Sequence, residues 1–524
     1  MSDDSISARD RRRHVERGFY PPTTYVLLDD LHIERAERLR RVHGPVEKVP
    51  DPVIRADRPC EGLFVWSHSG LIYDAPAQRF KLWYHAHDSD YPSRHPELRW
   101  NSRPAFATSR DCLQWKKPNL GVVSWKGSRR NNLVRFPPYG GSGPLTSVFK
   151  DPAPDERGYL AMGMARFRAP RGATPMYWLR DGGYQADRKR ASDIPIVCGF
   201  YVYDSPDGFV WKRRRRMLMS NAICTDNVFV QGFDPHLNKW IVFAQARTAG
   251  KFRTMGVCFC DDLDYMPFPQ EALTPDDDDP PGCQSNHMVA SRVPGGFAGL
   301  VVDFRPHEGC RKEPQLVFSR DARVWSRTAG REPFIPAGPP GSWDEMNVFV
   351  HNPVAVGDDI FIMYHGSITG NGSFFPEQRG GRTRYVRVGE WGTPLPDGRL
   401  NLPGLGLAKL RRDRWAGMAP IARTGVLQTK RMYWAGRELR INADARGGAI
   451  RAELRDHDGR PVPGFTMRES DPFQGDRLDH RMSWQSKRML PAKFLGTART
   501  QGTIGRMMSI RFHLERATLY TFSC

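Results

Sequence analysis

Four acidic residues lie directly before apolar segments of the sequence. They are Glu61 in "RPCEGLFVW", Asp226 in "CTDNVFVQGFD", and Asp344 and Glu345 in "GSWDEMNVFVHNP". An acid beside a buried strand is costly to bury without a partner, so these positions are candidates for chemistry. Two carboxyl groups can cleave a glycosidic bond, about 5–5.5 Å apart for retention or about 6.5–9.5 Å apart for inversion. We predict the acid, base or nucleophile among the four; the alternative for each is a structural or solvated strand entry.

Asp151 lies in "SVFKDPAPDERGYLAMGMA", between two short apolar runs. Asp74 and Asp234 occupy the same place in two related segments. Our first interpretation of Asp151 is therefore a turn residue that bonds backbone N–H groups. It stays a catalytic candidate because, if it faced the centre of the fold, its charge would tune the other acids.

Polar and aromatic residues near the same apolar runs are candidates for substrate binding. Trp343 could stack on the face of a sugar ring. Arg166 and Arg247 close second strands and could hold a carboxylate or sulfate through paired hydrogen bonds. The other candidates are Trp66, His68, Asn286, His287 and Asp303, the last followed by Arg305. For each of them the alternative is an ordinary structural role, and for the arginines a surface ion pair.

No metal or cofactor motif stands out. "YHAHD", residues 84–88, places His85 and His87 on one face of a strand, but no third ligand accompanies them. The nine cysteines form no CxxC pair and no zinc spacing, and their odd number is typical of reduced thiols. We expect no metal and no cofactor.

The elements that must position these residues are strands in two interlocking repeats. Five segments pair two apolar runs across a polar turn: "LIYDAPAQRFKLWYHA", "SVFKDPAPDERGYLAMGMA", "VQGFDPHLNKWIVFAQA", "MVASRVPGGFAGLVVDF" and "PVAVGDDIFIMYHG". Between them, "ATSRDCLQW", "VYDSPDGFVW" and "LVFSRDARVW" each combine a Ser-x-Asp turn with a Trp, and "CFCDDLDYM" is a degenerate copy. The Asp should cap turn N–H groups and the Trp should hold the next strand. The two repeats predict an all-β fold, a five-bladed β-propeller.

The chain divides into three predicted parts. The propeller is placed at residues 51–415. The hairpin "GGAIRAELRDHDGRPVPGF", with its Asp-Gly turn, and the closing apolar strands predict a C-terminal β-sandwich at 416–524. Residues 1–50 are expected to form an arm that packs on the propeller, with one short helix near "LHIERAERLRRVHG".

The charge balance is strongly basic, with 78 Lys and Arg against 58 Asp and Glu, a net charge of +20. Such an excess can attract nucleic acid, anionic membrane or an acidic polysaccharide. No basic stripe interleaved with aromatics indicates a nucleic-acid groove, and no apolar run is long enough to span a membrane. We expect a carbohydrate partner, no nucleic acid and no membrane; the oligomeric state is left open. No signal-peptide pattern is visible, so the cytoplasm is the expected location, with export by another route left open.

The hairpin repeat, the "FKDP" segment and the C-terminal strands resemble glycoside hydrolase family 32 and its relatives of family 43. More closely, they resemble a bacterial family 32-like branch, through the arm "DD-x-x-I-E" (here Asp29 to Glu34), an "E-G" entry to the first blade and the "SRD-x-x-x-W" turns. In family 32, the Asp of "WMNDPNG" is the nucleophile, the Asp of "RDP" stabilises the transition state and the Glu of "EC" is the acid/base. Only "KDP", with Asp151, has a counterpart here. Trp66 lies where the first motif would be, and there is no Glu-Cys dipeptide.

This resemblance implies a glycoside hydrolase acting on a furanoside or another glycan, with its carboxylates in the central funnel. The alternatives are a non-catalytic carbohydrate-binding propeller, or a transferase or lyase acting on an anionic glycan. Three acids that meet in the funnel would favour hydrolysis. A funnel lined by Arg, His and aromatic side chains, with at most one acid, would favour binding or lysis.

Overall fold

The described part of the molecule consists of β-strands joined by turns. The computed structural model describes residues 24–87, 102–137, 145, 147–152, 158–168, 196–220, 228–248, 252–389, 391–434, 438–488 and 507–524. Within these ranges the helical elements are two 3₁₀ turns, Pro59–Glu61 and Pro306–Glu308. The all-β prediction is confirmed.

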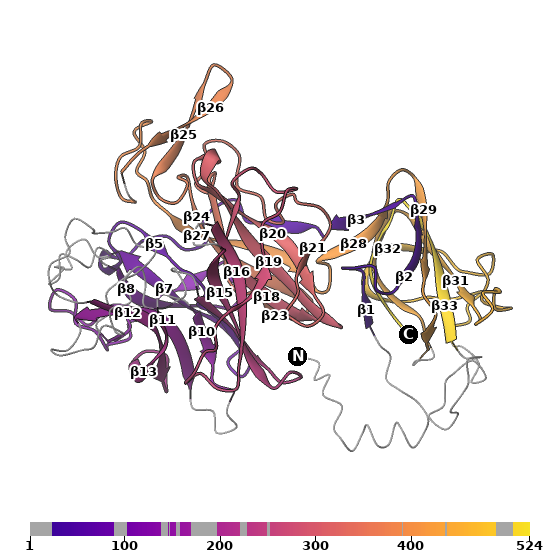
Figure 1. Cartoon of the computed structure of the whole chain (residues 1–524), viewed down its shortest axis with the longest axis horizontal. Helices are drawn as coiled ribbons and strands as arrows, with labels where there is room; N and C mark the ends of the chain where they lie inside the picture. The colour runs from indigo at the N-terminus through magenta and orange to yellow at the C-terminus, as the bar shows by residue number, and fades with distance from the viewer. Residues whose placement is uncertain are drawn as a thin grey trace.

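Three groups of strands each form a separate antiparallel sheet (Figure 1). The first group is β5 (Val65–Trp66), β6 (Leu71–Asp74), β7 (Arg79–His87), β8 (Ser102–Ser109) and β9 (Trp115–Lys116). The second is β10 (Ser147–Lys150), β11 (Tyr159–Arg168), β12 (Ile196–Ser205) and β13 (Lys212–Ser220). The third is β14 (Val228–Asp234), β15 (Lys239–Thr248), β16 (Phe252–Cys260) and β17 (Gln270–Leu273).

Two further groups share one sheet, joined by a single parallel pair, Lys312 with Asn347. The fourth group is β18 (Gln284–Val293), β19 (Gly296–Arg305), β20 (Arg311–Ser319) and β21 (Ser326–Arg327). The fifth is β22 (Asn347–Val350), β23 (Val354–Val356), β24 (Asp359–Ser367), β27 (Gly404–Arg411) and β4 (Val46–Lys48). Its outermost strand, β4, comes from the start of the chain and pairs with β27.

The five predicted hairpins are confirmed as antiparallel pairs, one in each group: β6–β7, β10–β11, β14–β15, β18–β19 and β23–β24. Hydrogen bonds connect the segments at the start of successive groups in a closed sequence. They are Ser69 with Val148, Ser147 with Val230, Gln231 with Ala290, His287 with Val350, and Asn352 with Ser69. The five groups therefore surround a common centre.

The Ser-x-Asp turns form as expected. In the first group, the Asp111 carboxylate accepts the N–H groups of Leu113 and Gln114, each at 2.9 Å, and the Trp115 indole donates to the Cys112 carbonyl at 2.9 Å. The same bonds recur around Asp207 and Trp211, and around Asp321 and Trp325. The degenerate copy keeps the carboxylate bonds of Asp262 without a Trp.

The remaining sheet contains ten strands and encloses its own core, at the right of Figure 1. Its strands are β1 (Thr24–Val26), β2 (Ile33–Glu37), β3 (Leu39–His43), β28 (Ala416–Pro420), β29 (Thr424–Thr429), β30 (Met432–Tyr433), β31 (Arg440–Arg455), β32 (Phe473–Arg481), β33 (Met507–Glu515) and β34 (Thr518–Ser523). The sixteen-residue β31 pairs with β32, β33 and β34 and so holds the sheet together.

The predicted helix near "LHIERAERLRRVHG" is wrong. The segment forms β2 and β3, which pair with β29 and β28. Arg38 between them has φ of 55°, a left-handed conformation that a right-handed helix cannot contain. Tertiary strand pairing supplies the backbone hydrogen bonds here and outweighs the local helix propensity. Residues 24–43 thus join the last sheet, while the predicted domain boundaries stay predictions.

An insertion, residues 368–403, separates β24 from β27. It contains the two-stranded sheet of β25 (Phe374–Arg379) and β26 (Arg382–Arg387), which projects from the strand groups at the top of Figure 1. Seven described cysteines are unpaired: 60, 112, 258, 260, 283, 310 and 524. Across the described ranges, no helix has the length and apolar character needed to cross a membrane.

Candidate active site

The five strand groups have two distinct ends. At one end lie the hairpin turns; at the other the first strand begins and the second strand finishes, as the pairs Val65–Ala86 and Asn347–Ser367 show. We call this second end the mouth. Asp151 lies at the turn end of its hairpin, where its backbone N–H donates to the Gly158 carbonyl at 3.2 Å.

The other two turn acids support a structural reading of this position. The Asp234 carboxylate accepts the N–H groups of His236 and Leu237, at 3.0 and 2.8 Å, and pairs with Arg292 at 2.6 Å. Asp74 pairs with Lys81 at 2.6 Å. A catalytic role for Asp151 is an untested prediction.

Glu61 is buried, with every carboxylate oxygen engaged. Its Oε2 accepts from the Lys117 ammonium at 2.7 Å and from the N–H groups of Asp57 and Arg58, at 3.0 and 3.1 Å. Its Oε1 accepts the Tyr84 hydroxyl hydrogen. The residue thereby ties the segment before β5 to the segment after β9.

Asp344 repeats this arrangement in the fifth group. It pairs with Lys48 of β4 at 2.7 Å and accepts the Tyr364 hydroxyl hydrogen at 2.9 Å. The two lysines also lie over the two tyrosine rings, at 5.8 Å in the first group and 5.5 Å in the fifth. A third pair, Asp279 with Arg327 at 2.6 Å, fills the equivalent place in the fourth group. We call these three the entry ion pairs: each joins the start of a group to its outermost strand.

The centre of the five groups is filled with imidazole and aromatic rings. The histidines are His68, His85, His287, His351 and His365. His287 stacks on Phe349 at 3.6 Å, and Trp66 stacks on His85 at 4.3 Å. His68 contacts Phe229 and Phe349 from the first group, so one ring reaches the third and fifth groups.

These imidazoles are neutral. Burial lowers the pKa of His287, His351 and His365 to about 3 and that of His85 to about 4. Both His287 and His365 also face Lys312, whose charge lowers their pKa further. A charged imidazole here would have to be desolvated without a counter-ion among the described residues around it.

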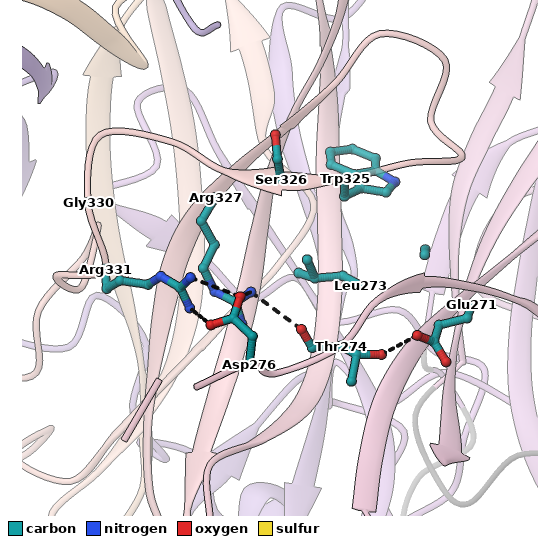
Figure 2. Close-up of a pocket in the computed structure, with 10 residues that line it drawn as sticks. Glu271, Leu273, Thr274, Asp276, Trp325, Ser326, Arg327, Gly330 and Arg331 are labelled. Carbon is teal, nitrogen blue, oxygen red and sulfur yellow. Dashed lines mark hydrogen bonds and ion pairs between the residues drawn. The ribbon is translucent and has the colours of Figure 1, made fainter. Parts of the chain in front are cut away.

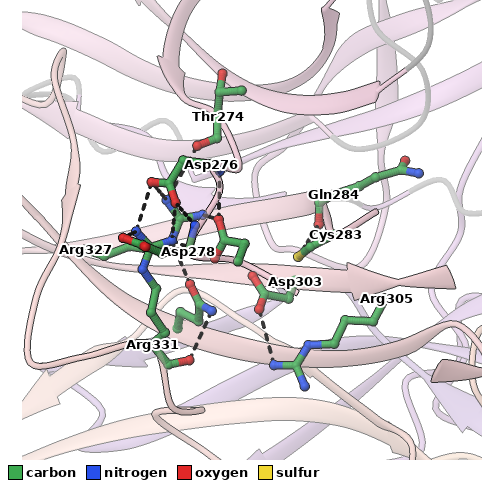
Figure 3. A network of polar contacts seen from close by, with 11 residues as sticks. Thr274, Asp276, Asp278, Cys283, Gln284, Asp303, Arg305, Arg327 and Arg331 are labelled. Atoms are coloured by element: carbon green, nitrogen blue, oxygen red, sulfur yellow. Dashed lines mark hydrogen bonds and ion pairs between the residues drawn. The ribbon is translucent and has the colours of Figure 1, made fainter. Parts of the chain in front are cut away.

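At the mouth, a second set of carboxyl groups is held by shared arginines. Asp303 lies 3.4 Å from Arg305, which also lies 3.4 Å from Glu313, and Glu313 is 3.1 Å from Arg311. Glu345 accepts the Gly341 N–H at 2.7 Å and faces the charge of Arg311. We call Asp303, Arg305, Arg311, Glu313 and Glu345 the mouth cluster. Figure 3 shows Asp303 directed at the Arg305 guanidinium.

Burial shifts two acids of the mouth cluster towards the protonated form. Asp303 is 1% exposed, and burial raises its pKa to about 7 although Arg305 opposes the shift. Burial also raises the pKa of Glu345, against its hydrogen bond from Gly341 and the charge of Arg311. A carboxyl group with a pKa near 7 can donate a proton at neutral pH.

The insertion covers this end of the centre. Its Trp391 contacts His365 at 4.9 Å, Phe64 at 5.8 Å and Trp66 at 6.3 Å. Its Asn371 accepts a hydrogen bond from Lys312 at 2.9 Å. Tyr385 of β26 lies beside the mouth cluster, since the charges of Arg311 and Glu345 both act on its pKa.

A cavity of about 560 Å³ lies elsewhere, on the flank between β17 and β21 (Figure 2). Arg327 and Arg331 line it, but both bind Asp279, at 2.6 and 2.8 Å, and Arg331 also binds Asp276 at 2.8 Å. Its cations are thus neutralised by neighbouring acids, in the network that Figure 3 shows. The cavity is bordered by structural ion pairs between the segment that precedes β18 and the arginines in and after β21.

The structure brings some of the sequence candidates together and separates others. Trp66, His68 and His287 meet in the centre, next to Asn286, whose carbonyl accepts from Gln245 at 2.7 Å. Asp303 and Glu345 meet in the mouth cluster, whereas Glu61 and Asp344 lie in separate entry ion pairs. Trp343 stacks on Tyr364 at 5.7 Å, beside Asp344. Asp226 and the side chains of Arg166 and Arg247 lie outside the described residues.

Sequence reasoning missed His351, His365, Lys312, Arg311 and Glu313. The signal for His365 was present: "MYHG" in β24 repeats "WYHA" in β7, so Tyr364–His365 matches Tyr84–His85. The run "RKEP" at the start of β20 carried Arg311, Lys312 and Glu313, but no pattern marked it as central.

Within the described part of the chain, no three His, Cys, Asp or Glu side chains are arranged to hold a metal ion. The two candidate ligands His85 and His87 each have another partner. His85 approaches the Leu145 carbonyl at 3.2 Å, and the His87 ring stacks on Phe64 at 4.3 Å.

Comparison with known proteins gives similarity in structure alone. No protein-family model and no curated protein matches the sequence. An N-acetylgalactosamine deacetylase from F. plautii is 14% identical, covering 76% of this chain and 95% of that chain, with a TM-score of 0.37. A β-1,2-mannobiose phosphorylase from Listeria innocua is 10% identical, covering 70% and 96%, with a TM-score of 0.42. A family 32 β-fructofuranosidase from Bombyx mori is 10% identical, covering 99% and 98%, with a TM-score of 0.38. Similarity at this level assigns no activity to the chain.

Proposed function

We propose that the protein is a glycoside hydrolase whose five strand groups are the blades of a propeller, with a β-sandwich after residue 416. The closed sequence of contacts between first strands supports five blades. The observation that carries the activity is the mouth cluster: a buried carboxyl, Asp303, with a pKa of about 7, linked through shared arginines to a second carboxyl, Glu345.

In this proposal Asp303 is the general acid. Its proton passes to the glycosidic oxygen as the bond from that oxygen to the anomeric carbon breaks, which releases the leaving sugar as an alcohol. Ionised Glu345 acts as the second carboxylate, either by taking a proton from the attacking water or by bonding to the anomeric carbon itself. Arg305 and Arg311 hold the two carboxyls in place through Glu313. The proposed substrate is a furanoside or another glycan, as the sequence resemblance implies.

A screen of aryl furanosides and pyranosides tests the activity, with Asp303→Asn and Glu345→Gln as the variants. Each should lower kcat by at least about 100-fold, the usual scale for loss of acid–base catalysis. Glu308→Gln is the matched control, because Glu308 also pairs with Arg305, at 3.5 Å, but is 40% exposed. Its kcat should stay within about threefold of the original protein. Full turnover in both Asp303→Asn and Glu345→Gln would contradict the proposal.

The pH profile provides a second reading of the same site. Asp303 must be protonated, so activity should fall as the pH rises through about 7. Glu345 must be ionised, so activity should also fall at acid pH. In Asp303→Asn any residual activity should lose the alkaline limb and keep the acid one.

A second candidate function is carbohydrate binding without catalysis. The observation that favours it is the centre, where neutral imidazoles, aromatic rings and the Lys312 ammonium lie together, while Glu61 and Asp344 are neutralised in entry ion pairs. Saturable glycan binding with no turnover of any substrate in the screen would favour this function over hydrolysis.

A further inference from the structure

The hairpin of β25 and β26 carries an unusual concentration of unpaired positive charge. Its arginines, Arg379, Arg382, Arg384 and Arg387, are all exposed. No described carboxylate lies within 4 Å of any of the four guanidinium groups. Some exposed arginines elsewhere do pair, such as Arg35 with Glu37 and Arg423 with Glu515, while others, such as Arg129 and Arg130, have no such partner among the described residues.

The register of the hairpin concentrates this charge further. Arg379 lies directly opposite Arg382 across the tip, and Glu377 is opposite Arg384. Directly opposed residues share a face, and so do residues two apart on one strand, so Arg379, Arg382 and Arg384 form one row. Like charges placed opposite each other destabilise a hairpin. Binding of an anion to this face would remove that repulsion.

The hairpin is attached next to the mouth cluster. Gly380 and Gly381 form its tip with φ of 58° and 74°, the left-handed conformation that a tight hairpin turn requires. Phe375 at its base is buried with Ile368 and Leu395. Tyr385, on the opposite face from the arginine row, packs against Gly309. Because Glu345 and Arg311 act on the pKa of that Tyr385, the base of the hairpin adjoins the mouth cluster.

We propose that the β25–β26 hairpin is the docking arm for an anionic polysaccharide, which it holds beside the mouth cluster. This rests on the proposed function, because it places the bound chain near Asp303 and Glu345. A guanidinium group binds carboxylate or sulfate through two parallel hydrogen bonds, and residues two apart on a strand repeat every ~6.6–6.8 Å. Arg382 and Arg384 have this spacing along β26, with Arg379 opposite Arg382, so the row suits a polymer that carries repeated anionic groups.

Two other polyanions fit the arm less well. Single-stranded nucleic acid is held by aromatic side chains that stack on the bases, and the arginine row has no exposed aromatic residue, since Phe375 on its face is buried. A membrane-binding arm would expose apolar side chains at its tip, where this one has Gly380 and Gly381 between arginines.

The test compares two triple variants that lose the same charge. One replaces Arg379, Arg382 and Arg384 with Gln. The control replaces Arg423, Arg446 and Arg460 of the last sheet, which are also exposed. Binding to polygalacturonate and chondroitin sulfate is measured against salt concentration, with linear arabinan as the neutral glycan. The hairpin variant should bind both polyanions at least about tenfold more weakly, with a less steep salt dependence, while the control changes less than about twofold.

A third variant replaces the three hairpin arginines with Lys, which keeps the positive charge but cannot bind an anion through two parallel hydrogen bonds. It should bind with intermediate affinity. Thermal melting checks that all variants fold. Equal weakening in the hairpin and control variants, or unchanged binding in both, would overturn the docking role. Tighter binding to single-stranded DNA or to phosphatidylserine vesicles than to either polysaccharide would overturn the choice of partner.

The outcomes separate this inference from the proposed activity. If the hairpin binds polyanions but Asp303→Asn leaves turnover unchanged, or no turnover exists, the docking role stands and the hydrolase assignment fails. If neutral glycans are cleaved and no polyanion binds, the hydrolase assignment stands and the docking role fails.

Discussion

The entry ion pairs and the mouth cluster both contain buried carboxyl groups, yet they differ in how those groups are neutralised. In an entry ion pair the buried carboxylate lies within 2.7 Å of a cation, and in two of the three it also accepts a tyrosine hydroxyl hydrogen, as Glu61 does from Tyr84 beside Lys117. In the mouth cluster two arginines are shared among several acids, and burial raises the pKa of Asp303. A close cation stabilises the ionised form of a buried carboxyl group. A buried carboxyl group whose nearby cations do not offset the cost of burial can instead gain or lose a proton near neutral pH.

This comparison shows why an acid before a strand is an ambiguous signal. Glu61 and Asp344 precede first strands, as a catalytic acid could, but each has a lysine from the outermost strand of its group. Whether a carboxyl is structural or reactive depends on partners that lie about 56 and 296 residues away in the sequence.

The largest effect on stability is expected when one member of an entry ion pair is replaced. Glu61→Gln removes the buried counter-ion of the Lys117 ammonium and leaves only the exposed Asp57 carboxylate beside it, so we expect a loss of about 3–5 kcal/mol in the free energy of unfolding. Urea unfolding measures it. The double variant Glu61→Gln with Lys117→Met should recover part of the loss, because no buried charge is then left unpaired. A single variant as stable as the original protein would show that the pair does not hold the group together.

At the mouth, replacing a buried carboxyl group should instead raise the free energy of unfolding. The pKa of Asp303 is raised in the folded protein, so its ionisation opposes folding: the effect is absent below about pH 4 and complete above about pH 7. Asp303→Asn should therefore raise the free energy of unfolding by up to about 4 kcal/mol at about pH 8, and the gain should shrink as the pH falls to about 4. A destabilised variant at about pH 8 would place Asp303 with the entry ion pairs.

The buried histidines of the centre allow a further test, through the pH dependence of the free energy of unfolding. The folded pKa of His351 is about 3, below that of the unfolded chain, so its contribution is present above about pH 6.5 and is lost as the pH falls towards 3. Each such histidine should add about 1.4 kcal/mol per pH unit to the slope of unfolding free energy against pH. His351→Asn should lower that slope by about 1.4 kcal/mol per pH unit, which corresponds to the uptake of one proton fewer on unfolding. An unchanged slope between about pH 4 and pH 6 would mean that His351 is not held neutral.

The smallest effect is expected at a surface pair. Asp51 and Arg55 lie 3.1 Å apart, but their side chains are 86% and 62% exposed. Arg55→Ala should change the free energy of unfolding by about 0.5 kcal/mol or less, measured beside Glu61→Gln in the same urea series. If Arg55→Ala lowered the free energy of unfolding as much as Glu61→Gln does, burial could not explain why the two ion pairs should differ in their effect on stability.

The sequence predicted the local features that repeat. Asp111 and Trp115, with their counterparts in two other groups, formed the expected turns because those bonds involve neighbours within a few residues. The five hairpins followed for the same reason. The helix expected in residues 31–44 failed because β2 and β3 pair with strands almost 400 residues away.

For the site, the sequence supplied residue types but not partners. It included Asp303 and Glu345, yet it could not distinguish Glu345 from Asp344, whose neighbour Lys48 comes from the start of the chain. The mouth cluster depends on Arg311 and Glu313, a charged pair in an otherwise unremarkable run. Such pairs become visible only when β19, β20 and the segment before β22 are placed side by side.

The position of β4 has a consequence for biosynthesis. Val46–Lys48 leaves the ribosome early, but its partner strand, Gly404–Arg411, is made some 360 residues later. During translation the early strand lacks this partner, and the fifth group is completed only when both strands have been made. Pairing of β4 with β27 is thus a late, long-range step, of the kind that slows folding and leaves an unpaired edge available to other chains in the meantime.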